Sequence, residues 1–145
     1  MELLKPEKIL KQSVYVEMLE DVNKYSDEMI KFCKNIDGVA LAAPQIGIFK
    51  KFFVTVSILY PNTVFINPYY EKTTKSKIIS SSESCLSYGK DNIYTVNRYE
   101  TIFAEWYDVK GEYFVEILSG IKSIIFQHET DHLSGITVVT KGVKI

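Results

Sequence analysis

The sequence of 145 residues predicts one domain of the α+β class. Apolar side chains recur at helical spacing in two segments, one in each half of the chain. Between them lie short strand-like runs separated by turn signals. No internal repeat, low-complexity tract or linker interrupts the chain, so we expect residues 1–145 to form a single domain.

The first predicted helix covers residues 14–36, where the apolar side chains lie close to helical spacing, and the Asp37-Gly38 turn signal ends it. A small apolar segment follows at residues 39–47, and its proline argues against a regular helix. Helical spacing returns over residues 119–133. The strand-like runs are residues 51–59, 63–70, 77–81, 100–109 and 112–118.

Two further segments carry weaker patterns. Residues 80–84 are mostly serine, and we expect an irregular loop that leads into Cys85. Residues 136–140 are rich in β-branched side chains and predict a last short strand. The expected loop would leave Cys85 free to approach the second helix.

Composition narrows the function classes. The chain has 17 Lys and Arg against 18 Asp and Glu, so no basic excess predicts binding to nucleic acid or to a membrane. Two cysteines are too few for a disulfide scaffold, and neither a secretory signal nor a run of about 18 apolar residues is found. We expect a protein of the reducing cytoplasm, with an organellar location as the alternative, and we expect it to be a monomer.

The chemistry is concentrated in residues 128–132, which read His-Glu-Thr-Asp-His. Positions i and i+4 of a helix lie on one face about one turn apart, so His128 and His132 can bind one metal ion. Glu129 follows the first of them, where it can reach a water on the metal without being a ligand. These two are the only histidines of the chain, and the pattern predicts a metal-binding helix.

A catalytic metal site has three protein ligands and one open position. The segment after His132 contains no Asp, Glu, His or Cys, so the third ligand must lie upstream. Cys85 is the best candidate, because a thiolate binds borderline-soft divalent metals strongly. Cys33 is the rival, but it falls on the apolar stripe of the first predicted helix, where a free cysteine is usually buried as a small hydrophobe.

Three segments together resemble the peptide deformylase family. Residues 38–45 read Gly-Val-Ala-Leu-Ala-Ala-Pro-Gln and are similar to its first motif, Gly-x-Gly-x-Ala-Ala-x-Gln. Residues 83–87 read Glu-Ser-Cys-Leu-Ser, against Glu-Gly-Cys-Leu-Ser in the second motif. Residues 127–132 match the third, Gln-His-Glu-x-Asp-His. The order is that of the family, and the chain resembles its compact members, which lack a C-terminal helical extension. The resemblance implies antiparallel or mixed sheets packed around a central metal-binding helix.

The resemblance implies a metal-dependent hydrolase that removes the formyl group from the N-terminal formyl-methionine of nascent polypeptides and releases formate. Cys85, His128 and His132 would bind the metal, and Glu129 would be the general acid and base. Gln45 and the backbone N–H of Leu86 would hold the oxygen of the formyl group as it becomes anionic.

The same resemblance implies supporting roles. Glu83 and Arg98 would form an ion pair that anchors the segment around Cys85. The substrate pocket would be lined by Gly38, Val39, Ala40, Ser84, Leu86, Ile121 and Ile125. Ala40 and Ser84 replace glycines of the motifs, so we expect their Cβ atoms to alter the cleft and its side-chain preference.

The resemblance implies one divalent ion, with ferrous iron as the native metal, while the ligand chemistry alone also suits zinc, nickel or cobalt. The expected partners are N-formylmethionyl nascent peptides at the ribosome, with no direct contact to nucleic acid. Three alternatives stay open: a metallopeptidase that uses the same helix motif, a peptide-binding protein that has lost turnover, and a purely structural metal site.

Overall fold

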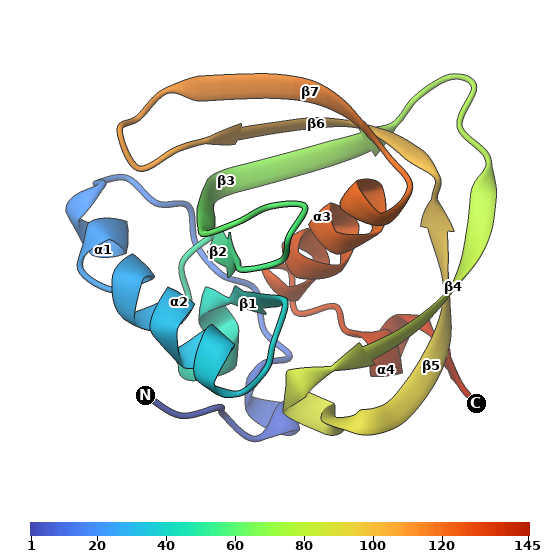
Figure 1. Cartoon of the computed structure of the whole chain (residues 1–145), viewed down its shortest axis with the longest axis horizontal. Helices are drawn as coiled ribbons and strands as arrows, with labels where there is room; N and C mark the ends of the chain where they lie inside the picture. The colour runs from blue at the N-terminus through green and yellow to red at the C-terminus, as the bar shows by residue number, and fades with distance from the viewer.

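The computed structural model describes residues 1–145, and two antiparallel sheets enclose one helix, α3 (Ile121–His132). The larger sheet has the strand order β1-β2-β3-β6-β7, and the smaller has the order β4-β5-β8. Figure 1 shows α3 between the two sheets, with the larger one above it. The predicted α+β class, with sheets around a central helix, is confirmed.

The strands are β1 (Ala40–Ala42), β2 (Phe52–Thr55), β3 (Thr63–Lys72), β4 (Ile78–Cys85), β5 (Gly89–Tyr99), β6 (Thr101–Tyr107), β7 (Tyr113–Ser119) and β8 (Val143–Lys144). Besides α3, the α-helices are α1 (Glu20–Asn23), α2 (Ser26–Asn35) and α4 (Val138–Lys141). Short 3-10 turns cover η1 (Pro6–Lys8), η2 (Ala43–Ile46) and η3 (Leu86–Tyr88). No helix of the chain is both long and apolar enough to cross a membrane.

The predicted first helix, residues 14–36, is wrong over residues 14–19. Helix α1 begins only at Glu20, and Lys24 and Tyr25 separate it from α2. Before α1, the backbone finds partners elsewhere in the chain: Val14 bridges to Lys50, and both backbone polar groups of Val16 bond to the side chain of Asn67. Because these tertiary bonds replace the intrahelical ones, the apolar spacing does not lead to a helix there.

The serine-rich segment, residues 80–84, is a strand rather than a loop. It belongs to β4, which pairs along most of its length with β5, a strand that the sequence did not predict. Buried and exposed residues alternate, with Ser81, Glu83 and Cys85 facing inward. Because the inward residues are polar or small, no hydrophobic period of two is visible in the sequence.

The last predicted strand, residues 136–140, is also wrong. Helix α4 occupies most of it, and the Thr137 hydroxyl accepts a hydrogen bond from the backbone N–H of Thr140, as in a capping box. This local capping outweighs the β propensity of the branched side chains, and only β8 that follows pairs with β5.

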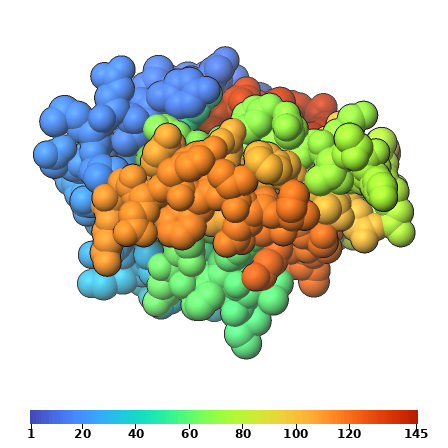
Figure 2. All heavy atoms as spheres, turned by 90° about the horizontal axis from the view of Figure 1, so that it is seen from above, coloured from blue at the N-terminus to red at the C-terminus, as the bar shows by residue number.

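Helix α3 is anchored through its apolar side. The ring of Phe126 meets Phe53 and Phe65 edge-on, each at a centroid distance of 5.6 Å, and it also contacts Trp106. All three phenylalanines are fully buried, and loss of such a ring costs about 3–5 kcal/mol. Figure 2 shows the β6–β7 hairpin, in orange, on the surface of the molecule, where it forms one edge of the larger sheet. This packing fixes which face of α3 turns toward β4.

Candidate metal centre

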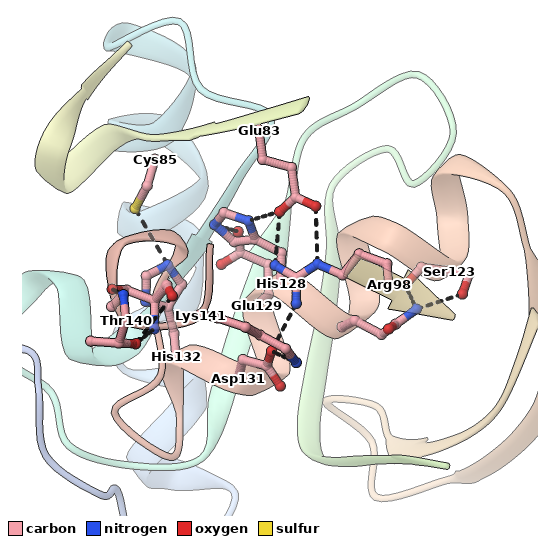
Figure 3. A network of polar contacts seen from close by, with 12 residues as sticks. Glu83, Cys85, Arg98, Ser123, His128, Glu129, Asp131, His132, Thr140 and Lys141 are labelled. Atoms are coloured by element: carbon pink, nitrogen blue, oxygen red, sulfur yellow. Dashed lines mark hydrogen bonds and ion pairs between the residues drawn. The ribbon is translucent and has the colours of Figure 1, made fainter. Parts of the chain in front are cut away.

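The opposite face of α3 presents His128 and His132, one helical turn apart, with ring centroids separated by 5.0 Å. Strand β4 ends at Cys85, whose Sγ lies 3.4 Å from Nε2 of His132. The donor atoms of these three residues all lie within 4.8 Å of one another (Figure 3). A cysteine from one sheet and two histidines from the central helix therefore converge on one point.

Glu83, two residues before Cys85 on the same face of β4, orients His128. Nδ1 of His128 lies 2.8 Å from Oε1 of Glu83, so the carboxylate accepts the proton on Nδ1 and leaves Nε2 free as a ligand atom. Arg98 on β5 donates two hydrogen bonds to the same carboxylate, at 2.8 and 2.9 Å. Burial disfavours the charged form of Glu83, but the bonds from His128 and Arg98 outweigh it and hold its pKa at about 2.

The sequence did not single out Asp131, which extends this network. Nη1 of Arg98 donates to Asp131 at 2.8 Å, and the Tyr70 hydroxyl and the Lys141 ammonium donate to the same carboxylate at 2.6 and 2.9 Å. The signals for Asp131 were its position between the two histidines and its place in the third family motif, neither of which gives it a role. Nothing in the sequence pattern pointed to Tyr70, which lies on β3, or to Lys141, the last residue of α4.

Glu129 is 6% exposed, and its Oε2 atom has no hydrogen-bond partner. Its other oxygen lies 3.9 Å from Nε2 of His128, on the side of the donor cluster. Burial raises the pKa of Glu129 to about 7, although the charges of His128 and Arg98 act in the opposite direction. An unpaired carboxylate that exchanges its proton near neutral pH fits a proton carrier beside a cationic ion. The thiol, the two imidazoles and this carboxylate together fit a divalent metal.

Gln45 lies on the other side of Cys85, in η2 directly after β1. Its side-chain oxygen accepts a hydrogen bond from the backbone N–H of Ala42 at 2.9 Å. Its amide nitrogen therefore points toward the cluster, 3.0 Å from the Ser87 hydroxyl and 3.5 Å from the Cys85 sulfur. The amide is held in one orientation, with its donor side toward the site. Ser87 is a second contact that sequence reasoning missed.

A cavity of about 290 Å³ opens beside this cluster. It is lined by most of the predicted site residues, namely Gly38, Val39, Ala40, Gln45, Glu83, Ser84, Cys85, Leu86, Ile125, His128 and Glu129. Asp37, Lys90 and Ile124 complete the lining. Ile121 is absent from it, because it lies one turn earlier on α3 with an exposed fraction of 63%. Ile124 and Ile125 supply the apolar wall that α3 gives to the cavity.

Gly38 has a steric reason to be glycine. A Cβ atom there would lie 2.8 Å from both the Cys33 sulfur and a methyl carbon of Leu86. Cys33 is fully buried below the cavity, and burial raises its pKa to about 12, so it stays a neutral thiol. The structure separates the two cysteines: Cys85 lies with the histidines, and Cys33 packs in the core beside α2.

The donor set consists of a cysteine at the end of a strand and two histidines of the enclosed helix, beside a buried glutamate. Such a site defines a metal-dependent hydrolase. The sequence profile of the polypeptide deformylase family matches residues 3–144, and the chain belongs to this family. Its members remove the N-formyl group from nascent polypeptides. The peptide deformylase of Thermotoga petrophila is 33% identical over 128 residues, which cover 84% of this chain and 73% of that protein.

Solved structures agree with this assignment. The Plasmodium falciparum peptide deformylase in complex with an inhibitor superposes with a TM-score of 0.86 and 31% identity, covering 97% of this chain and 88% of the other. The Thermotoga maritima peptide deformylase superposes with a TM-score of 0.85 and 30% sequence identity, covering 97% of this chain and 95% of the other. The deformylase of the Vibrio parahaemolyticus bacteriophage VP16T, in complex with actinonin, superposes with a TM-score of 0.85 and 27% sequence identity. The match covers 94% of this chain and 99% of the other.

Proposed function

We propose that Cys85, His128 and His132 hold one divalent metal ion and that the cavity beside it binds the formyl-methionyl end of a nascent peptide. The observation that carries this proposal is the convergence of the three donor atoms within 4.8 Å beside a buried glutamate oxygen that has no partner. A structural metal site normally has four protein ligands. Three donors next to an open cavity instead support catalysis.

When bound, a divalent ion would act as a Lewis acid and lower the pKa of water in its open position. Glu129 takes the proton from the attacking water, and it later returns that proton to the amine that leaves. Burial raises the pKa of this carboxyl group above its ordinary value, which favours its taking up a proton. The nitrogen of the Gln45 amide and the backbone N–H of Leu86 donate hydrogen bonds to the formyl oxygen as its negative charge develops.

The apolar wall of the cavity accounts for a methionine side chain. Leu86, Ile124 and Ile125 line it, and the remaining lining includes the small residues Gly38 and Ala40. A pocket of about 290 Å³ has room for one unbranched side chain together with the formyl group. Val39 has an exposed fraction of 58% and lies at the mouth, where the next peptide residue would pass.

We further propose that the native ion is ferrous iron, with zinc, nickel or cobalt as chemically suitable substitutes for a thiolate and two imidazoles. Residues 1–145 would act as one monomeric catalytic unit. Its substrate would be met where formylated chains are synthesised, at the ribosome in the cytoplasm.

The test is formate release from a formyl-methionyl-alanine peptide by protein loaded anaerobically with Fe²⁺. Stoichiometric formate and an intact methionyl-alanine bond support the proposal. Cleavage of the peptide bond without formate would indicate a metallopeptidase, and tight peptide binding without turnover by metal-loaded protein would indicate a binding protein. Cys85→Ala should lose metal and activity, while Cys33→Ala should retain both.

A further inference from the structure

The carboxylate of Asp131 lies between the metal helix and the segment that follows it. It is buried on the side of α3 that faces β5, and it accepts hydrogen bonds from Arg98, Tyr70 and Lys141. Figure 3 shows Lys141 and Arg98 approaching it from different elements. The Nζ atom of Lys141 and Nη1 of Arg98 meet the same oxygen, Oδ2.

Lys141 adds positive charge to a cluster that holds two buried carboxylates. Arg98 is the one guanidinium between the two buried carboxylates of Glu83 and Asp131, and it makes two hydrogen bonds to the first and one to the second. Lys141 supplies the second positive charge, directly on Asp131. Without it, Asp131 would compete with Glu83 for Arg98, because an uncompensated buried carboxylate is costly.

The backbone holds Lys141 in place for this contact. Val138, one turn earlier on α4, is buried against Cys85 and Val96. Gly142 follows so close to β5 that a Cβ atom would lie 2.8 Å from the carbonyl oxygen of Thr95 and 2.7 Å from that of Val138. Helix α4 is thus pressed against the same two strands that carry Cys85 and Arg98. Lys141 reaches Asp131 from a fixed position rather than from a mobile surface.

We propose that Lys141 is a positioning residue for the metal site. It occupies Asp131, which leaves Arg98 to hold Glu83, and Glu83 in turn orients the His128 ring with Nε2 toward the other two ligands. The inference rests on the proposed Cys85, His128 and His132 site. It adds that the segment after α3 takes part in metal binding although it contains no ligand.

The test is Co²⁺ binding to the full chain, measured by competition with a chelating dye and by the absorption of the thiolate–cobalt complex. Lys141→Met keeps the aliphatic stem and removes the charge. We expect this variant to bind Co²⁺ about tenfold more weakly and with a changed absorption spectrum. Tenfold is the lower end of the loss in affinity when a group that orients a metal ligand is altered. Lys141→Arg restores a cation that can reach Asp131 and should stay within about twofold of the wild type.

If Lys141 had a purely structural role, Lys141→Met would lower the stability of the protein and leave Co²⁺ binding unchanged. The side chain of Lys141 is 34% exposed, and a partly exposed ion pair alone would shift the melting temperature of the metal-free protein by no more than about 4 °C. Lys144→Met removes an exposed lysine from the same segment and is the matched control. Lys141→Gln, a second variant, keeps one hydrogen-bond donor and should fall between Lys141→Met and the wild type.

The proposal would be overturned if Lys141→Met and Lys141→Gln bound Co²⁺ within twofold of the wild-type affinity and with the same absorption spectrum. An equal loss of Co²⁺ affinity in Lys144→Met would overturn it as well. A wild-type chain that bound no Co²⁺ would instead overturn the metal site itself, and the inference with it. The two failures are therefore distinguishable.

Discussion

Nδ1 of His128 lies 2.8 Å from Oε1 of Glu83, a residue 45 positions earlier in the chain. This contact joins a strand of the smaller sheet to the central helix and fixes which nitrogen of the imidazole faces the cluster. It also ties the protonation of one buried carboxylate to the geometry of the candidate metal centre.

Acid should destabilise the metal-free protein through Glu83. Its pKa is about 2 in the folded chain and 4.5 ordinarily, so its contribution is present above about pH 4.5 and is lost as the pH falls toward 2. A difference of that size corresponds to roughly 3 kcal/mol. In urea unfolding, the stability gap between wild type and Glu83→Gln should narrow steadily from pH 5 to pH 3. A gap independent of pH would contradict the assignment.

Glu129→Gln should retain the fold and the bound metal but lose about 10²–10⁴ in turnover, because an amide cannot carry the proton. The measurement is formate release at saturating substrate, with metal content determined on the same sample. Glu100→Gln, which only breaks a surface ion pair with Lys77, is the matched control. Near-normal turnover in a fully metal-loaded Glu129→Gln protein would remove Glu129 from the mechanism.

Gln45→Leu should lower kcat about 10²–10³-fold with KM little changed, since one oxyanion donor is lost in the transition state. Ser87→Ala removes only the hydroxyl that the Gln45 amide contacts at 3.0 Å, so a smaller fall in kcat is expected. Steady-state kinetics and thermal unfolding of both variants give the answer. If Gln45 merely packs, its replacement would lower the melting temperature and leave kcat intact.

Gly38→Ala should destabilise the protein by about 1–3 kcal/mol, because the added Cβ overlaps the Cys33 sulfur and a Leu86 methyl group. Leu86 lines the cavity, so KM for the formyl peptide should rise as well. Cys33→Ala in the same chain removes one of the two overlaps and should recover part of the stability. A double variant no more stable than Gly38→Ala alone would show that the sulfur is not the obstacle.

The histidine helix was predictable from sequence because its signals are local. Helical spacing and the i, i+4 histidines lie within one segment, and α3 spans 12 of the 15 residues predicted at 119–133. The same holds for the strands with branched and aromatic side chains, such as β3 and β6. Strand β5 was not predicted because its polar residues show no period of two.

The supporting contacts could not be predicted for a related reason. Asp131 meets Tyr70 across 61 positions and Arg98 across 33, and no local pattern encodes such pairs. Glu83 and Arg98 entered the sequence analysis only through family resemblance. Residues 14–19 show the opposite failure, since a helical pattern was present but the bonds from Asn67 and Lys50 replaced the helix.

The position of α3 in the chain has a consequence for synthesis. Seven of the eight strands precede it, yet its Phe126 closes the aromatic cluster of Phe53, Phe65 and Trp106. While these strands leave the ribosome, their apolar faces have no helix to cover them, and the contacts of Phe126 with Phe65 and Phe53, across 61 and 73 positions, must wait. The larger sheet therefore gains its cover only once residue 132 has emerged, and until then the growing chain exposes surface that chaperones and proteases recognise.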